Sequence, residues 1–132
     1  VFTKPVQHHS MTHNQKKEEV AKELQKIDIF HLQQLSYVIS RMKEIKESDG
    51  TSLFENSLLT FGAGLGDGAT HQFFDLPMIV AGKGQGQIKQ GRFIKCKSGT
   101  LNSNLWLTLA NLMGLEIDSF ADSNAVISDL WT

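Results

Sequence analysis

The sequence predicts an α/β protein in which helices flank a small, mostly parallel sheet. A long helix is indicated between positions 15 and 47, where apolar residues advance in steps of three and four. Two short apolar runs, at 57–63 and 77–82, have the length and composition of buried strands. A glycine-rich segment joins them, and α/β sheets keep their sites where strands end. We therefore expect a site at one edge of this sheet.

Size and charge restrict the class of protein. The 132 residues suffice for one domain with a real core, and the 40% hydrophobic and 20% charged residues are typical of globular chains. Thirteen Lys and Arg against fourteen Asp and Glu give a net charge of −1, so no overall field favours nucleic acid. No apolar run approaches the roughly 18 residues of a membrane span. The lone Cys96 allows no internal disulfide.

The N-terminal half reads as a loop followed by one helix. Residues 1–14 carry His8, His9 and His13 without an apolar period, which predicts a loop. The helix over 15–47 has an apolar stripe with His31 at its one polar step. A core or boundary histidine is the simplest interpretation of His31, with a functional role as the alternative. The length of the helix also allows a break near 27–30. The stripe consists of Val20, Leu24, Ile27, Leu35, Val38, Met42 and Ile45.

The glycine-rich α/β half is expected over 53–132. After the turn residues 48–50, the segment 53–61 predicts a strand, and a second strand is expected over 76–82. A weaker third strand is expected over 91–95. Several N-cap side chains at 98–104 precede a helix over 103–113, which ends before Gly114.

The segment from Phe61 to His71 is the first candidate for a site. It has glycines at 62, 64, 66 and 68, and it carries Asp67 and His71. It lacks the Gly-Lys-Ser/Thr of a phosphate-binding loop, and its loose Gly-x-Gly-x-x-Ala match to a dinucleotide loop leads to a strand instead of a helix. A glycine turn that packs closely for structural reasons is the simplest alternative.

A metal site is the chemistry that these residue types suit best. Asp67 and His71 offer ligands for zinc, manganese or iron, and the histidines at 8, 9 and 13 form a second local cluster. Exposed histidines need no ligand, however, so spacing alone leaves both interpretations open. Ser10 and Thr70 lie near histidines, but no orienting carboxylate can be placed for a nucleophile. Basic residues could attract an anion or simply solubilise a hairpin: Lys83, Lys89, Arg92, Lys95 and Lys97.

Several motifs together resemble a known family. The runs LFENSLLTFGAGLGDGATH at 53–71, DLPMIVAG at 75–82 and GRF at 91–93 resemble the uncharacterised family called domain of unknown function 1552. The segments HHSMTH at 8–13 and IDIFH at 27–31 are similar to the part of the family's sequence that precedes the strand before the glycine loop. The resemblance covers about residues 8–115. Members of that family are much longer, so the resemblance implies that residues 1–132 are either a single α/β domain, an unusually reduced member of the family, or a C-terminal fragment of a larger protein.

The resemblance also implies a fold and an activity. The family looks like a remote branch of the alkaline phosphatase and sulfatase superfamily, which implies the C-terminal part of an α/β/α sandwich with a metal site at strand ends. It implies a metal-dependent phosphoester or sulfoester hydrolase that uses zinc, manganese or calcium on an anionic small-molecule ester. His71 and His13 match family histidines, whereas Gly64-Leu65 stand where relatives place an acidic ligand pair. Only Asp67 lies close enough to substitute for that pair.

Two functions therefore remain open at this stage. In the first, the nucleophile and remaining ligands of a hydrolase come from a missing N-terminal portion. In the second, the chain is a non-catalytic binding or structural module that has lost the superfamily metal site. The resemblance implies an exported or periplasmic location. An uncovered helix face and an unpaired sheet edge would also favour self-association, or association with the missing portion.

Overall fold

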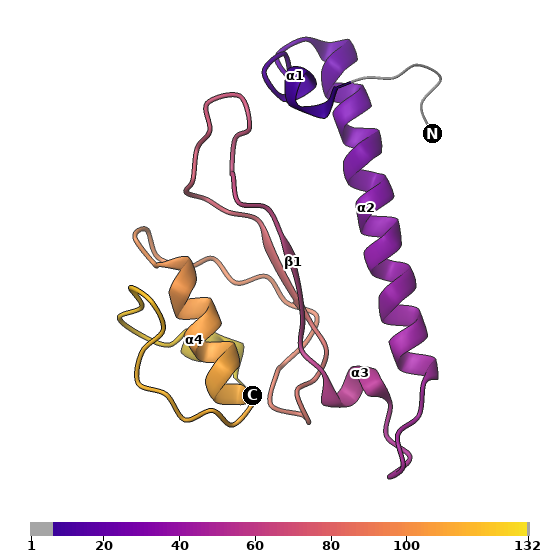
Figure 1. The fold of residues 1–132 in the computed structure, drawn as a ribbon, viewed down its shortest axis with the longest axis vertical. Coiled ribbons are helices and arrows are strands. Elements are labelled where there is room, and N and C mark those ends of the chain that lie inside the picture. The colour runs from indigo at the N-terminus through magenta and orange to yellow at the C-terminus, as the bar shows by residue number, and fades with distance from the viewer. Residues whose placement is uncertain (1–6, 132) are drawn as a thin grey trace. The chain divides into compact units, whose positions relative to one another are not determined.

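The structure is a computed structural model that describes residues 7–131. The elements, in chain order, are α1 (His8–Thr12), α2 (Glu18–Glu44), α3 (Leu53–Asn56), β1 (Leu59–Gly62), β2 (Met78–Ala81), α4 (Asn102–Leu112) and the 3-10 helix η1 (Ser128–Leu130) (Figure 1). They fall into two compact units. Among the described residues, the first unit holds 7–40 together with Thr60–Val80, and the second holds Arg41–Leu59 together with 81–131.

The long helix is confirmed as a single element. Figure 1 shows α2 as one unbroken helix, so the break allowed near 27–30 does not occur. The reason is that the sequence from 15 to 47 contains neither Pro nor Gly. Glu18 and Glu19 in its first turn and Arg41 and Lys43 in its last turn complement the helix dipole. No residue of α2 is buried, although its stripe is apolar.

The sheet is the main correction to the predicted fold. It has two strands, β1 and β2, and they run antiparallel, so the prediction of a mostly parallel sheet was wrong. A parallel pair needs a long crossover, usually a helix, but residues 63–77 only turn back. The Ala63 N–H donates to the Pro77 carbonyl at 3.3 Å directly beyond the strands. The described residues contain no α/β/α sandwich.

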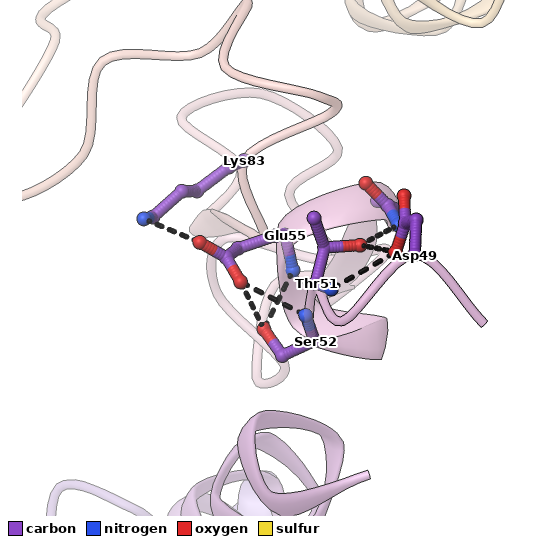
Figure 2. A network of polar contacts seen from close by, with 6 residues as sticks. Asp49, Thr51, Ser52, Glu55 and Lys83 are labelled. Atoms are coloured by element: carbon purple, nitrogen blue, oxygen red, sulfur yellow. Dashed lines mark hydrogen bonds and ion pairs between the residues drawn. The ribbon is translucent and has the colours of Figure 1, made fainter. Parts of the chain in front are cut away.

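The strand predicted over 53–61 begins with a helix instead. Ser52 caps α3, because its Oγ accepts the Glu55 N–H at 3.3 Å while a Glu55 carboxylate oxygen accepts the Ser52 N–H at 2.9 Å. Figure 2 shows this capping box, with Lys83 reaching the other Glu55 oxygen at 3.3 Å. A Ser-x-x-Glu pattern favours a helix start, and it outweighs the apolar run that follows. Only Leu59–Gly62 remains extended as a strand.

The core of the second unit is organised around α4. This helix starts and ends one residue earlier than predicted, and Gly114 follows it with a φ of +83°. Its N-cap is Leu101, so none of the predicted capping side chains is used. The third strand predicted over 91–95 is not formed; Ile88 instead makes a single bridge to Trp131. Eight hydrophobic side chains are buried in the described part of this unit: Phe54, Ala81, Ile88, Leu105, Leu107, Leu109, Leu112 and Leu130.

Polar side chains of α4 hold the C-terminal segment against it. The Asn104 Oδ1 accepts the Asn124 N–H at 2.9 Å, and its Nδ2 donates to the Asn124 Oδ1 at 3.0 Å. One turn later, the fully buried Thr108 hydroxyl accepts the Ile127 N–H at 2.8 Å. Buried polar groups need such partners, so these bonds fix where the chain after α4 returns.

Candidate metal site

Two histidines share one face of the short helix α1. The loop predicted over 1–14 was wrong for residues 8–12, and residues 1–6 lie outside the described part of the chain. His9 lies in α1 and His13 is its C-cap, so the two are four residues apart, the spacing of neighbours on a helix face. Their ring centroids lie 4.7 Å apart. The helix is anchored by the buried Met11.

A tight turn in the glycine loop presents His71. Asp67 and Gln72 face each other in an antiparallel bridge; the Gly66 N–H donates to the Gln72 carbonyl at 2.7 Å, and the Gln72 N–H to the Asp67 carbonyl at 2.9 Å. A Cβ on Gly66 would lie 2.3 Å from the Phe74 carbonyl oxygen, so this close approach requires glycine. His71 has a φ of +55°, which is uncommon for a residue other than glycine. Such backbone conformations cluster at functional sites.

The turn and α1 bring the imidazoles together. The Nε2 atoms of His13 and His71 lie 3.3 Å apart, and the ring centroids lie 5.0 Å apart. The His9 ring centroid lies 6.3 Å from that of His71. All three side chains are exposed. Histidines separated by more than fifty positions in sequence therefore form one cluster, which we call the imidazole cluster (His9, His13 and His71).

Asp67 has a different role in this geometry. Its Oδ1 accepts the Ala69 N–H at 2.8 Å and a hydrogen bond from the Gln15 side chain, and its Oδ2 accepts the Thr70 hydroxyl at 2.9 Å. The Ala69 N–H, followed by the Thr70 hydroxyl, lowers the pKa of Asp67 below its usual range. Among the described residues it makes no hydrogen bond with His13 or His71. Asp67 therefore ties the turn to the segment before α2, and its role as a ligand stays a prediction.

The spacing of the two Nε2 atoms suits a shared cation. Two nitrogens bound to zinc at about 2.0–2.1 Å with a tetrahedral angle lie about 3.3–3.4 Å apart. The same distance fits a hydrogen bond between two neutral imidazoles, one donating and the other accepting. Within residues 7–131, no group of three or more His, Cys, Asp or Glu is arranged to hold a metal as it stands. The third imidazole of the cluster, that of His9, is therefore not placed to bind a metal together with His13 and His71 as it stands.

The other predicted site residues are not brought to this cluster. In the described chain the Ser10 hydroxyl donates to the Gln7 side chain at 3.2 Å and the Thr70 hydroxyl to Asp67, so neither bonds a histidine. Lys83 pairs with Glu55, and the Arg92 side chain donates to the carbonyls of Lys89 and Trp131.

His8 and His31 are exposed and belong to no part of the imidazole cluster, and Cys96 is an exposed free thiol. His9 is the residue that sequence reasoning missed as a partner for His71. Its signal was the four-residue spacing from His13, which becomes informative only once the segment is helical.

One open hollow occurs in the second unit. Its volume is about 270 Å³, and it is lined by Gln87, Asn111, Leu112 and Trp131. The Gln87 side chain donates to the Leu112 carbonyl at 2.9 Å. These lining residues include no titratable group, so their side chains offer no general acid or base.

Comparisons with family models, curated proteins and solved structures gave no match. The resemblance noted from the motifs therefore stays a prediction. No helix among the described residues is both long and apolar enough to span a membrane.

Proposed function

We propose that this chain binds a divalent transition metal through His13, His71 and His9. The observation that carries the proposal is the 3.3 Å separation of the His13 and His71 Nε2 atoms, on two segments remote in sequence. Imidazole is a ligand that suits zinc, whereas calcium prefers oxygen. Zinc is therefore the favoured ion, and manganese would fit if Asp67 joined the site.

We further propose that the site belongs to a metal-dependent hydrolase of phosphate or sulfate esters. Three protein ligands would leave one position for a water or an ester oxygen, as catalytic zinc sites do. A bound metal supplies Lewis acidity and a lowered pKa for water. The imidazole cluster is exposed, so an anionic small-molecule ester could reach it. The nucleophile and further ligands would come from residues outside this sequence, in a protein that the motif resemblance suggests is exported or periplasmic.

Zinc titration of purified protein by calorimetry tests the metal proposal. We expect His13→Ala and His71→Ala each to weaken zinc binding at least about 100-fold, because they remove the two ligands whose nitrogens already face each other. His9→Ala should have a smaller effect, because the His9 ring centroid lies 6.3 Å from that of His71. His8→Ala is the matched control, since it deletes an exposed histidine of the same helix outside the imidazole cluster. Wild-type protein without zinc binding, or equal weakening by His8→Ala, would contradict the proposal.

A non-catalytic module is the second candidate function. Its support is Gly64-Leu65, which stand where the resembled family places an acidic ligand pair. A panel of phosphate, sulfate and phosphonate esters, tested with zinc, manganese and calcium, separates the two candidates. Turnover abolished by His71→Ala with the fold intact supports the hydrolase. Zinc binding without turnover, tested on the encoded full-length protein, supports the module.

A further inference from the structure

The segment between β2 and α4 carries a charge that the chain as a whole does not. Residues 76–115 contain five Lys or Arg and no Asp or Glu, although the whole chain has a net charge of −1. Four of these cations lie within nine residues, in the sequence KQGRFIKCK at 89–97, which we call the basic loop. Salt screens exposed charges beyond about 8 Å, so this local excess governs what the loop attracts.

The cations of the basic loop are not neutralised by carboxylates. The ion pairs found within residues 7–131 all involve lysine or arginine side chains outside this loop. The side chains of Lys89, Lys95 and Lys97 are exposed. They are therefore free to meet an anionic partner.

The loop is fixed at one side chain and presents the next one to solvent. The Arg92 side chain donates to the Lys89 carbonyl at 3.1 Å and to the Trp131 carbonyl at 3.2 Å. Ile94 is half-buried, whereas Phe93 between them is 89% exposed, the largest fraction among the large hydrophobic side chains of the described residues. A single exposed phenyl ring needs no explanation by itself. Its position among unpaired lysines is the unusual feature.

We propose that the basic loop binds the surface of an anionic phospholipid bilayer, with the Phe93 ring at the boundary between headgroups and acyl chains. Lys89, Lys95 and Lys97 would lie at the level of the lipid phosphates. Each lysine near such a surface strengthens binding about fivefold. Burial of the phenyl ring adds at least about tenfold.

The pairing of charge with an apolar ring favours a bilayer over other anionic partners. A small anion would engage the lysines and leave the ring in water. A single-stranded nucleic acid binds along a positively charged groove with several aromatic side chains on which successive bases stack. The basic loop has one aromatic residue, Phe93. A bilayer offers anionic headgroups and an apolar layer side by side, which matches both features.

Cosedimentation with lipid vesicles tests the proposal. We expect the protein to bind vesicles of equal parts phosphatidylcholine and phosphatidylglycerol, and this binding should fall as salt rises. Vesicles of phosphatidylcholine alone should bind far less. No binding to the anionic vesicles, or equal binding to both compositions, would overturn the proposal.

The contribution of charge is tested by two double variants. Lys95→Gln with Lys97→Gln should weaken vesicle binding about 25-fold, because two cations are removed from the loop. Lys16→Gln with Lys17→Gln is the matched control, since it makes the same change at exposed lysines ahead of α2, and it should leave binding unchanged. Equal weakening by both pairs would show that charge acts without regard to position, and would overturn the assignment to the loop.

The contribution of the aromatic ring is tested in the same way. Phe93→Ala should weaken vesicle binding at least about tenfold. Phe73→Ala is the matched control, because this ring is 79% exposed but has no lysine beside it in sequence, and it should leave binding unchanged. Circular dichroism checks that each variant keeps its helices. Unchanged binding by Phe93→Ala would overturn the insertion of this ring.

A fluorescent label shows whether the loop itself makes the contact. Cys96 is the lone cysteine and its thiol is exposed, so an environment-sensitive fluorophore can be attached within the loop. Its emission should shift to the blue with anionic vesicles, and should not shift with inorganic phosphate or with a single-stranded oligonucleotide. Vesicle binding without a shift would place the contact elsewhere and overturn the proposal. A shift with the oligonucleotide and none with vesicles would assign the loop to nucleic acid instead.

The lipid and metal proposals rest on different residues and can fail separately. The basic loop contains no member of the imidazole cluster. His13→Ala should therefore bind anionic vesicles like the wild type, and the loop variants should bind zinc like the wild type. Loss of vesicle binding in His13→Ala would overturn the assignment of lipid binding to the loop alone.

Discussion

The two units of the chain differ in where their stability and their chemistry lie. Among residues 7–40 and 60–80, the described part of the first unit, only Met11 is buried. The second unit holds the hydrophobic core around α4 and buries Asn104 and Thr108 with hydrogen-bond partners. The imidazole cluster lies entirely in the first unit, on segments held by turns and local hydrogen bonds. The hydrophobic core and the candidate metal ligands therefore belong to different units.

This contrast suggests that binding completes the first unit. Segments with few buried contacts open locally at low free-energy cost. A metal that binds only the folded arrangement would stabilise it. The second unit needs no such contribution for its core.

Truncation of a core leucine should give the largest effect. Leu109→Ala in α4 is expected to lower the free energy of unfolding of the second unit by about 2–5 kcal/mol, because it leaves a cavity at a buried site. Leu32→Ala in α2 is the matched control, since this side chain is 44% exposed, and should change it by less than about 0.5 kcal/mol. Urea unfolding followed by hydrogen exchange measures both. Similar losses from the two variants would erase the contrast between the units.

Zinc binding is expected to stabilise the first unit and to leave the second unchanged. At a free zinc concentration 100 times its Kd, the first unit is expected to gain about 2.7 kcal/mol. Hydrogen exchange should therefore slow at the amides of 8–14 and 66–72 while those of α4 keep their rates. His71→Ala should abolish the slowing and His8→Ala should keep it. Slowing confined to α4 would show that zinc acts elsewhere.

The sequence predicted those parts of the fold that local signals determine. The continuous 3.6-residue period predicted α2, and Gly114 marked the end of α4. The errors lie where local signals compete or where pairing is non-local. At 53–61 the Ser52–Glu55 capping box overrode an apolar run, and the direction of the strands depended on a connection that turns back without a helix.

The candidate site was predictable only in part, for a related reason. Asp67 and His71 stood out because of the glycine loop, and His13 because of the histidine cluster before the long helix and the resemblance to a family. The contacts of these side chains are with residues far away in sequence. Asp67 accepts a hydrogen bond from Gln15, fifty-two positions away, and His71 lies against His13, fifty-eight positions away. A single sequence carries no record of such contacts. His9 became visible as a partner only through the helix that joins it to His13.

A smaller effect is expected from the polar side chains of α4. Asn104→Ala should destabilise the second unit by about 1–3 kcal/mol, because it removes a buried side chain and leaves the part-buried Asn124 N–H without its acceptor. Ser103→Ala is the neighbouring control. The Ser103 hydroxyl is buried without a hydrogen-bond partner in the described structure, so its removal should be neutral or stabilising. Urea unfolding distinguishes the two, and equal losses would show that burial alone sets the cost.

The smallest effect should come from the capping box of α3. Hydrogen bonds from Ser52, with a further contribution from Lys83, lower the pKa of Glu55 from 4.5 to about 2. A carboxyl whose pKa is depressed in the folded state stabilises it fully above the unfolded value, and this contribution is lost as pH falls from about 4.5 to about 2. Thermal unfolding of wild type and Glu55→Gln should therefore differ at pH 6 and converge near pH 2.

The cause of that shift can be separated by a second variant. Because the Ser52 hydrogen bonds are the largest contribution, Lys83→Met should keep most of the pH dependence. If Lys83→Met removes it entirely, the Lys83–Glu55 ion pair, drawn in Figure 2, controls the carboxylate, and the helix cap does not. Loss of the difference already at pH 5 would show that the pKa of Glu55 is not depressed. The first result would make this end of the second unit depend on a surface charge.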